Sequence, residues 1–130
     1  PGEILTYIHV PISGSGASSA YKRLAYRSAI DYPIVSVGVS VQTDDAIVKA
    51  ARIAVGSMSR APLLLGQVAR LLEGNSITDA DVMAEVADRC RDLASTFAVD
   101  NVGANVDYRS QMVSVLVRRA LEEAFKNIDT

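Results

Sequence analysis

The sequence predicts an α+β domain in which strands come first and helices follow. The clearest strand is residues 34–41, where bulky β-branched residues alternate with Ser36, Gly38 and Ser40. From Pro62 onward, apolar residues recur at three- and four-residue spacing, as on one face of an amphipathic helix. A chain of 130 residues with 49% hydrophobic content can bury one core. Strand patterns followed by helix patterns are typical of the α+β class.

The first 20 residues predict one more strand and a linker. Residues 3–10, EILTYIHV, alternate in the manner of a strand, which Pro11 would end. We therefore interpret His9 as a strand histidine with a partner rather than a metal ligand, because no Cys or acidic cluster lies near it at metal-ligand spacing. Residues 12–20, ISGSGASSA, predict a loop or linker. Gly14 and Gly16 form a GxG, but no full phosphate-binding motif and no clear helix follows, so we favour a flexible connection.

Residues 44–58 fit two structures. Asp44 and Asp45 would cap a helix, yet the same residues alternate as a strand would, and a tight turn at residues 43–45 would pair that strand with residues 34–41. The strand is the slightly better fit. Asp44 and Asp45 are then a solvated turn rather than an acid/base pair.

Three helices are predicted in the second half. The first begins near Pro62 and ends at Gly74-Asn75, the second runs from Thr78 to about residue 95, and the third covers about residues 107–126. Residues 97–106 connect the last two. Cys90 lies on the apolar stripe of the second helix, which predicts a small core residue rather than a reactive thiol.

Composition excludes several classes of protein. A net charge of −2, the absence of Trp and 5% aromatic residues argue against nucleic-acid binding. No apolar run is long enough for a membrane span. One cysteine cannot form an internal disulfide, which favours a reducing compartment, the cytoplasm. One His and one Cys leave only carboxylates as metal ligands. The start at Pro1 without Met suggests a processed or excised piece.

One charged cluster stands out. Lys22, Arg23 and Arg27 lie in a short span that ends at Asp31, next to the strand at residues 34–41. The small residues of that strand share one face, which would let a backbone, a helix or a flat ligand approach closely. The cluster is either a solvated edge strand or a site that neutralises an anionic cofactor or docks a partner.

Four blocks of sequence, in chain order, carry a resemblance to a known family. They are PGEILTYIHVP at residues 1–11; Tyr21, Lys22-Arg23, Arg27 and Asp31 before the valine-rich strand; ARIAVG at residues 51–56 with Pro62; and Tyr108-Arg109 with Leu121. Together they resemble the C-terminal domain of the FAD-binding medium subunit of molybdenum hydroxylases, the family of aerobic carbon monoxide dehydrogenase and xanthine dehydrogenase. The similarity spans nearly the whole chain.

The resemblance implies a three- to four-stranded antiparallel sheet followed by a three-helix bundle packed on one face. It implies that residues 46–57 are a strand, and that residues 1–130 are a single domain from a longer FAD-binding subunit. Such a subunit relays electrons from iron–sulfur clusters, reduced by a molybdopterin subunit, to an acceptor. The flavin-cradling glycine loops belong to preceding domains, so we expect this chain alone to bind FAD weakly or not at all and not to be catalytic.

The resemblance carries a cofactor-binding role to Arg23, with Lys22 as the neighbouring candidate and Asp31 near the ring edge. Adjacent strand residues point to opposite faces. The face of Lys22, shared with Leu24 and Tyr26, is the more apolar and should pack on the helices, which leaves Arg23 for the cofactor.

The expected partners are the N-terminal FAD-binding domains, the iron–sulfur subunit and the molybdopterin subunit. An exposed apolar patch should mark where they pack, and it would permit a homodimer of the isolated chain. The alternative function is a non-catalytic protein-interaction module.

Overall fold

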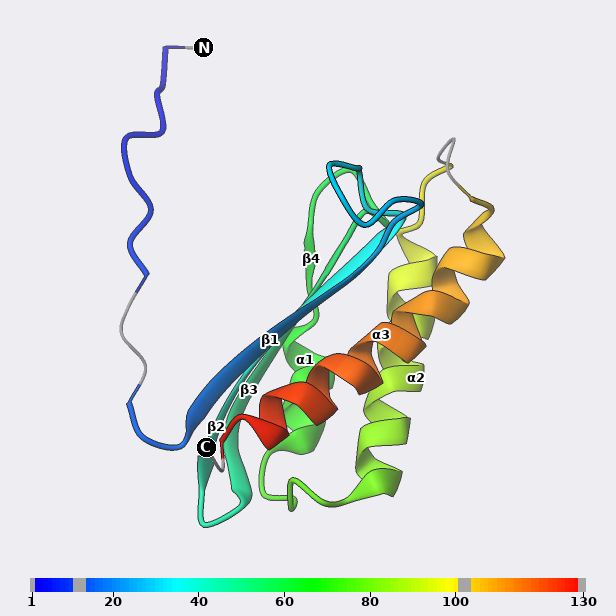
Figure 1. Ribbon diagram of the computed structural model, residues 1–130. Helices are drawn as coiled ribbons and strands as arrows, with labels where there is room; N and C mark the ends of the chain where they lie inside the picture. The colour runs from blue at the N-terminus through cyan, green and yellow to red at the C-terminus, as the bar shows by residue number, and fades with distance from the viewer. Residues whose placement is uncertain (1, 11–13, 101–103, 129–130) are drawn as a thin grey trace.

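The computed structural model describes residues 2–10, 14–100 and 104–128. It shows one antiparallel sheet with helices on one side (Figure 1). The strands are β1 Ala17–Leu24, β2 Val35–Asp44, β3 Ile47–Gly56 and β4 Leu63–Leu64, in the spatial order β1-β2-β3-β4. The helices are α1 Gly66–Ala69, the 3₁₀ turn η1 Arg70–Leu72, α2 Ala80–Thr96 and α3 Val106–Lys126. The predicted α+β class and the antiparallel sheet are confirmed, although the first helix is short.

The core lies between the inner face of the sheet and the helices. α3 packs across β1 and β2, α2 packs against α3, and α1 with η1 packs against β3. The valine-rich pattern of β2 follows from this arrangement, because every second residue faces the helices and is excluded from water. These inward residues are Val35, Val37, Val39 and Val41 of β2, Val48, Ala51, Ile53 and Val55 of β3, and Val113, Leu116, Val117, Ala120 and Leu121 of α3.

The hairpin between β2 and β3 confirms the strand interpretation of residues 46–57. Its turn residues, Asp45 and Ala46, have φ of 46° and 67°, the sign that a type I′ turn requires at both positions. Lys49 pairs with Asp44 beside the turn, at 3.4 Å between Nζ and Oδ2. The turn therefore lies at Asp45-Ala46, slightly after the predicted residues 43–45, and Asp44 is the last residue of β2.

Gly16 has a structural role at the start of β1. Its φ is +74°, and a Cβ there would lie 2.5 Å from the carbonyl oxygen of Thr43. The carbonyl of Gly16 accepts hydrogen bonds from the amide and the hydroxyl of Thr43, at 2.8 and 3.1 Å. The prediction of a loop over residues 12–20 is wrong from Ala17 onward, because small residues there pair with β2; residues 11–13 lie outside the described part of the chain.

The strand predicted for residues 3–10 is also wrong. Residues 2–10 have no strand assignment and are exposed, including His9, which lies outside any sheet. The alternation is present, but a strand forms only where a second strand supplies hydrogen bonds, and none of the described residues pairs with this segment. We call residues 2–10 the N-terminal arm.

The single helix predicted from Pro62 is wrong in its first turn. Leu63 and Leu64 pair with Val55 and Ala54 of β3, and the amide of Leu65 donates to Ile53 at 2.8 Å. These bonds hold the backbone extended, so α1 begins only at Gly66.

The other helix predictions are close. Asp79 rather than Thr78 caps α2, accepting from the Val82 amide at 3.1 Å. α3 begins one residue before the predicted 107. Cys90 is fully buried, as predicted. No helix among the described residues combines the length and apolar character needed to cross a membrane.

Candidate functional site

The face of the sheet away from the helices is open at its centre. One cross-strand row joins Tyr21, Gly38, Ala54 and Leu64, since each pairs with the next in the sheet. Tyr21 and Leu64 are 58% and 70% exposed, and a Cβ at Gly38 would meet no atom within 4 Å. The row is therefore a shallow, accessible floor between two raised apolar side chains. We call it the open face.

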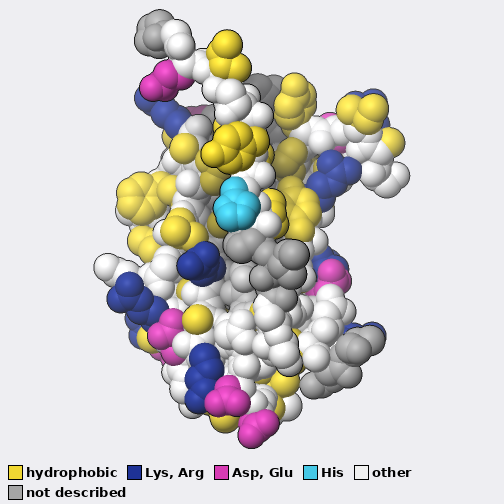
Figure 2. All heavy atoms as spheres, turned by 90° about the vertical axis from the view of Figure 1, so that its left-hand side faces the viewer, with side chains coloured by type: hydrophobic (Ala, Val, Ile, Leu, Met, Phe, Trp, Pro, Cys, Tyr) yellow, Lys and Arg dark blue, Asp and Glu magenta, His cyan; other side chains and the backbone are white. Residues whose placement is uncertain are grey.

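Figure 2 looks onto the molecule from the side of the N-terminal arm and shows many hydrophobic side chains at the surface. The arm contributes to them, because its large apolar side chains are 76–86% exposed. They are Ile4, Leu5, Tyr7, Ile8 and Val10. Apolar surface on this scale indicates a contact surface.

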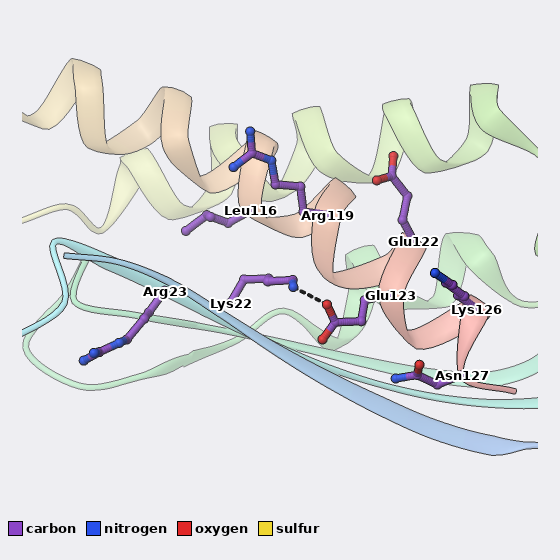
Figure 3. A pocket seen from close by; sticks show the side chains of 8 residues that line it. All are labelled: Lys22, Arg23, Leu116, Arg119, Glu122, Glu123, Lys126 and Asn127. Atoms are coloured by element: carbon purple, nitrogen blue, oxygen red, sulfur yellow. Dashed lines mark hydrogen bonds and ion pairs between the residues drawn. The ribbon is translucent and has the colours of Figure 1, made fainter. Parts of the chain in front are cut away.

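Lys22 points away from the open face, toward α3. Its ammonium pairs with the carboxylate of Glu123, as Figure 3 shows. The predicted position of Lys22 on the helix side of β1 is thereby confirmed. Around the pair lies a hollow of about 630 Å³ with four cations and two acids. Its lining residues are Lys22, Arg23, Arg119, Lys126, Glu122, Glu123, Leu116 and Asn127.

Arg23 is exposed and turns into the loop that follows β1. Its Nη1 donates to the carbonyl of Asp31 at 3.1 Å, and its Nη2 donates to the carbonyls of Ser28 and Ala29, both at 3.0 Å. The guanidinium thus binds three carbonyl oxygens of one loop. We call residues 25–34 the clasped loop.

Asp31 braces the same loop from within. Its carboxylate accepts from the amides of Arg27 and Tyr32, at 3.0 and 2.9 Å, and lies 3.8 Å from the Arg27 Nε. A hollow of about 360 Å³ is lined by Arg27, Ile30, Asp31 and Tyr32. The structure therefore brings Arg23, Arg27 and Asp31 together and leaves Lys22 on the other side of β1.

Sequence reasoning missed two residues of the open face. Tyr21 shares the outward face of β1 with Arg23, and this alternation was available in the sequence. Leu64 carried no such signal, because it was assigned to a helix. No group of three or more His, Cys, Asp or Glu residues in the described segments could hold a metal ion.

These features define a class of protein: an α+β domain whose sheet is covered by helices on one face and open on the other. The chain belongs to the CO dehydrogenase flavoprotein C-terminal domain family, whose model matches residues 9–124. It is 28% identical, over 124 residues, to the carbon monoxide dehydrogenase medium chain of Afipia carboxidovorans. That match covers 95% of this chain and 42% of the relative, so the chain spans about two fifths of the relative's length.

Solved structures support the fold. A carbon monoxide dehydrogenase from Hydrogenophaga pseudoflava matches with a TM-score of 0.81 and 22% identity, over 90% of this chain and 39% of that one. Quinoline 2-oxidoreductase from Pseudomonas putida 86 matches with a TM-score of 0.75 and 19% identity, over 88% of this chain and 39% of that one.

Proposed function

We propose that this chain is the C-terminal domain of an FAD-binding subunit of a molybdenum hydroxylase, and that its open face covers the flavin. The observation that carries the proposal is the open row from Tyr21 to Leu64, in a member of a flavoprotein domain family. A flat ring fits over Gly38 and Ala54, because neither projects a large side chain, and Tyr21 offers an aromatic surface beside it.

The other residues around the ring have separate roles. Arg23 and Asp31 border the open face through the clasped loop, whereas Lys22 is not proposed as a ligand, because it pairs with Glu123 on the helix side. Gly14 and Gly16 do not form a phosphate cradle: β1, not a helix, follows them. The FAD pyrophosphate is held by preceding domains, so the isolated chain binds FAD weakly or not at all.

The bound flavin would accept electrons from iron–sulfur clusters and pass them on to an acceptor. The partners are the N-terminal FAD-binding domains of the subunit, an iron–sulfur subunit and a molybdopterin subunit. Exposed apolar side chains of the arm support such packing. The single buried cysteine is consistent with a cytoplasmic enzyme.

Gly38→Val in the full-length subunit tests this function. A valine projects from the floor, so FAD retention should fall about tenfold or more, whereas the isolated chain should be as stable as before, because the position is open and Gly weakens a strand. Lys49→Val, an exposed change at the far end of the hairpin, is the matched control. If the Gly38→Val subunit binds FAD as tightly as the control, the open face does not cover the flavin.

The alternative, a non-catalytic interaction module, is favoured by the exposed apolar side chains of the arm. Flavin absorbance of the purified full-length protein separates the two, because an interaction module would purify without flavin.

A further inference from the structure

We infer that Arg23 is a positioning residue: its guanidinium fixes the clasped loop and acts on the flavin site only through that loop. The effect on the loop stands on the structure alone. The effect on flavin rests on the proposed function.

The geometry shows where the guanidinium is engaged. Two of its nitrogens serve three carbonyls, those of Ser28, Ala29 and Asp31, all within 3.1 Å. These oxygens converge on one point, where their partial negative charges would repel one another without a cation. The planar guanidinium spreads these bonds over two nitrogens held in a fixed fork, a geometry that the single nitrogen of a lysine does not reproduce.

The tip of the clasped loop buries little apolar surface. Ile30 and Tyr32 near the tip are 96% and 91% exposed, whereas Ile34 at the base is buried in the core. A loop tip whose large side chains face solvent gains little from burial, so the order of the tip depends on polar contacts. At the base of the loop, the Ile34 amide donates to the carbonyl of Leu24 at 2.7 Å. At the tip, Arg23 and the Asp31 carboxylate make the hydrogen bonds described above.

The position of Arg23 makes this order relevant to the site. It lies two residues after Tyr21 and on the same face of β1, so the clasped loop begins at the end of the open face. Holding the loop in one conformation fixes Asp31 and Tyr32 at that border before any ligand arrives. Such preorganisation strengthens binding because less freedom is lost when the ligand binds.

Hydrogen exchange of the chain tests the effect on the loop. Arg23→Gln removes the charged donor that binds the three loop carbonyls, so the loop should open more often. The Arg27 and Tyr32 amides should then exchange about tenfold or more faster. Amides of β2 and β3 should keep their rates, which shows that the fold is intact. Lys22→Gln removes the same charge from the opposite face and should leave the loop amides unchanged. Wild-type rates at both loop amides in Arg23→Gln would overturn the inference.

Flavin titration of the full-length subunit tests the second part. Arg23→Gln should weaken FAD binding, and Arg23→Lys should restore part of the affinity together with the same part of the loop protection. Lower affinity with undisturbed loop amides would instead make Arg23 a direct ligand. Faster exchange of the loop amides with unchanged FAD affinity would show that the order of the loop does not affect flavin binding. A full-length wild type without flavin would refute the proposed function and leave the exchange result standing.

Discussion

Arg109 is the most unusual residue of the core, because a full guanidinium is buried there with neutral partners. Its Nη1 donates to the carbonyl of Val99 at 2.8 Å and its Nη2 to the carbonyl of Ser57, while its Nε has no hydrogen-bond partner. No ion pair involves it among the described residues. Ser57 follows β3 and Val99 follows α2, so one side chain joins the sheet to the connection before α3.

We therefore predict that Arg109→Ala destabilises the chain by about 3 kcal/mol. The substitution leaves two carbonyls without their donor and opens a cavity, although removing a buried charge offsets part of the loss. Chemical denaturation measures the effect, with the exposed Arg118→Ala as a control that should change stability by less than about 0.5 kcal/mol. Equal stability of the two variants would show that Arg109 does not join these elements.

Cys90 gives the stability a pH dependence in the alkaline range. Burial raises the pKa of its thiol from the ordinary value of 9.0 to about 12. Above pH 9 the unfolded chain loses this proton while the native chain keeps it, so stability falls as pH rises, by up to roughly 1.4 kcal/mol per pH unit. Cys90→Ala should show a shallower decline in urea melts between pH 8 and 11. Parallel declines in the two proteins would contradict this account.

At the scale of elements, the turn between β2 and β3 carries backbone strain. Ala46 has φ of 67°, a left-handed conformation that costs an L-residue roughly 1–2 kcal/mol. Ala46→Gly removes that cost but adds entropy to the unfolded chain, so we expect a gain of about 0.5–1 kcal/mol in thermal or urea unfolding. Ala51→Gly, in the buried part of β3, should lower stability instead. A loss of stability in Ala46→Gly would mean that the turn is not strained.

The elements also show how far the sequence predicts this fold. β2 and α3 were predictable, because a buried face imposes a period of two on a strand and of about 3.6 on a helix over many residues. β4 was not, because two residues have no period and their strand conformation comes from bonds to Val55 and Ala54. The arm shows the converse: residues 3–10 have a strand pattern without a partner strand.

The candidate site was predictable only in part. Alternation along β1 separated Lys22 from Arg23, and the structure confirms that separation. It could not show that Arg23 turns into its own loop, because the carbonyls of Ser28, Ala29 and Asp31 converge only once the loop is folded. A sequence pattern does not indicate where backbone carbonyl oxygens will lie.

At the scale of the whole molecule, the helices cover one face of the sheet, while the arm extends away from the body on the other side (Figure 1). The five large apolar side chains of the arm contribute almost nothing to this core, since at least three quarters of each is exposed. β1 is at the same time an edge strand, with backbone groups available on one side. An unpaired apolar segment and an unpaired edge in one molecule favour association between chains.

We therefore predict that the isolated chain forms dimers as its concentration rises, and that the arm causes this. Replacing Leu5, Tyr7 and Ile8 by Ser removes apolar surface that would be buried between chains, so the variant should remain monomeric in sedimentation equilibrium. Its unfolding midpoint at low concentration should match the wild type, because these residues lie outside the core. Leu64→Ser, an exposed leucine elsewhere on the sheet, is the control and should still associate. A wild-type chain that stays monomeric at high concentration and binds no apolar dye would show that the arm does not mediate self-association.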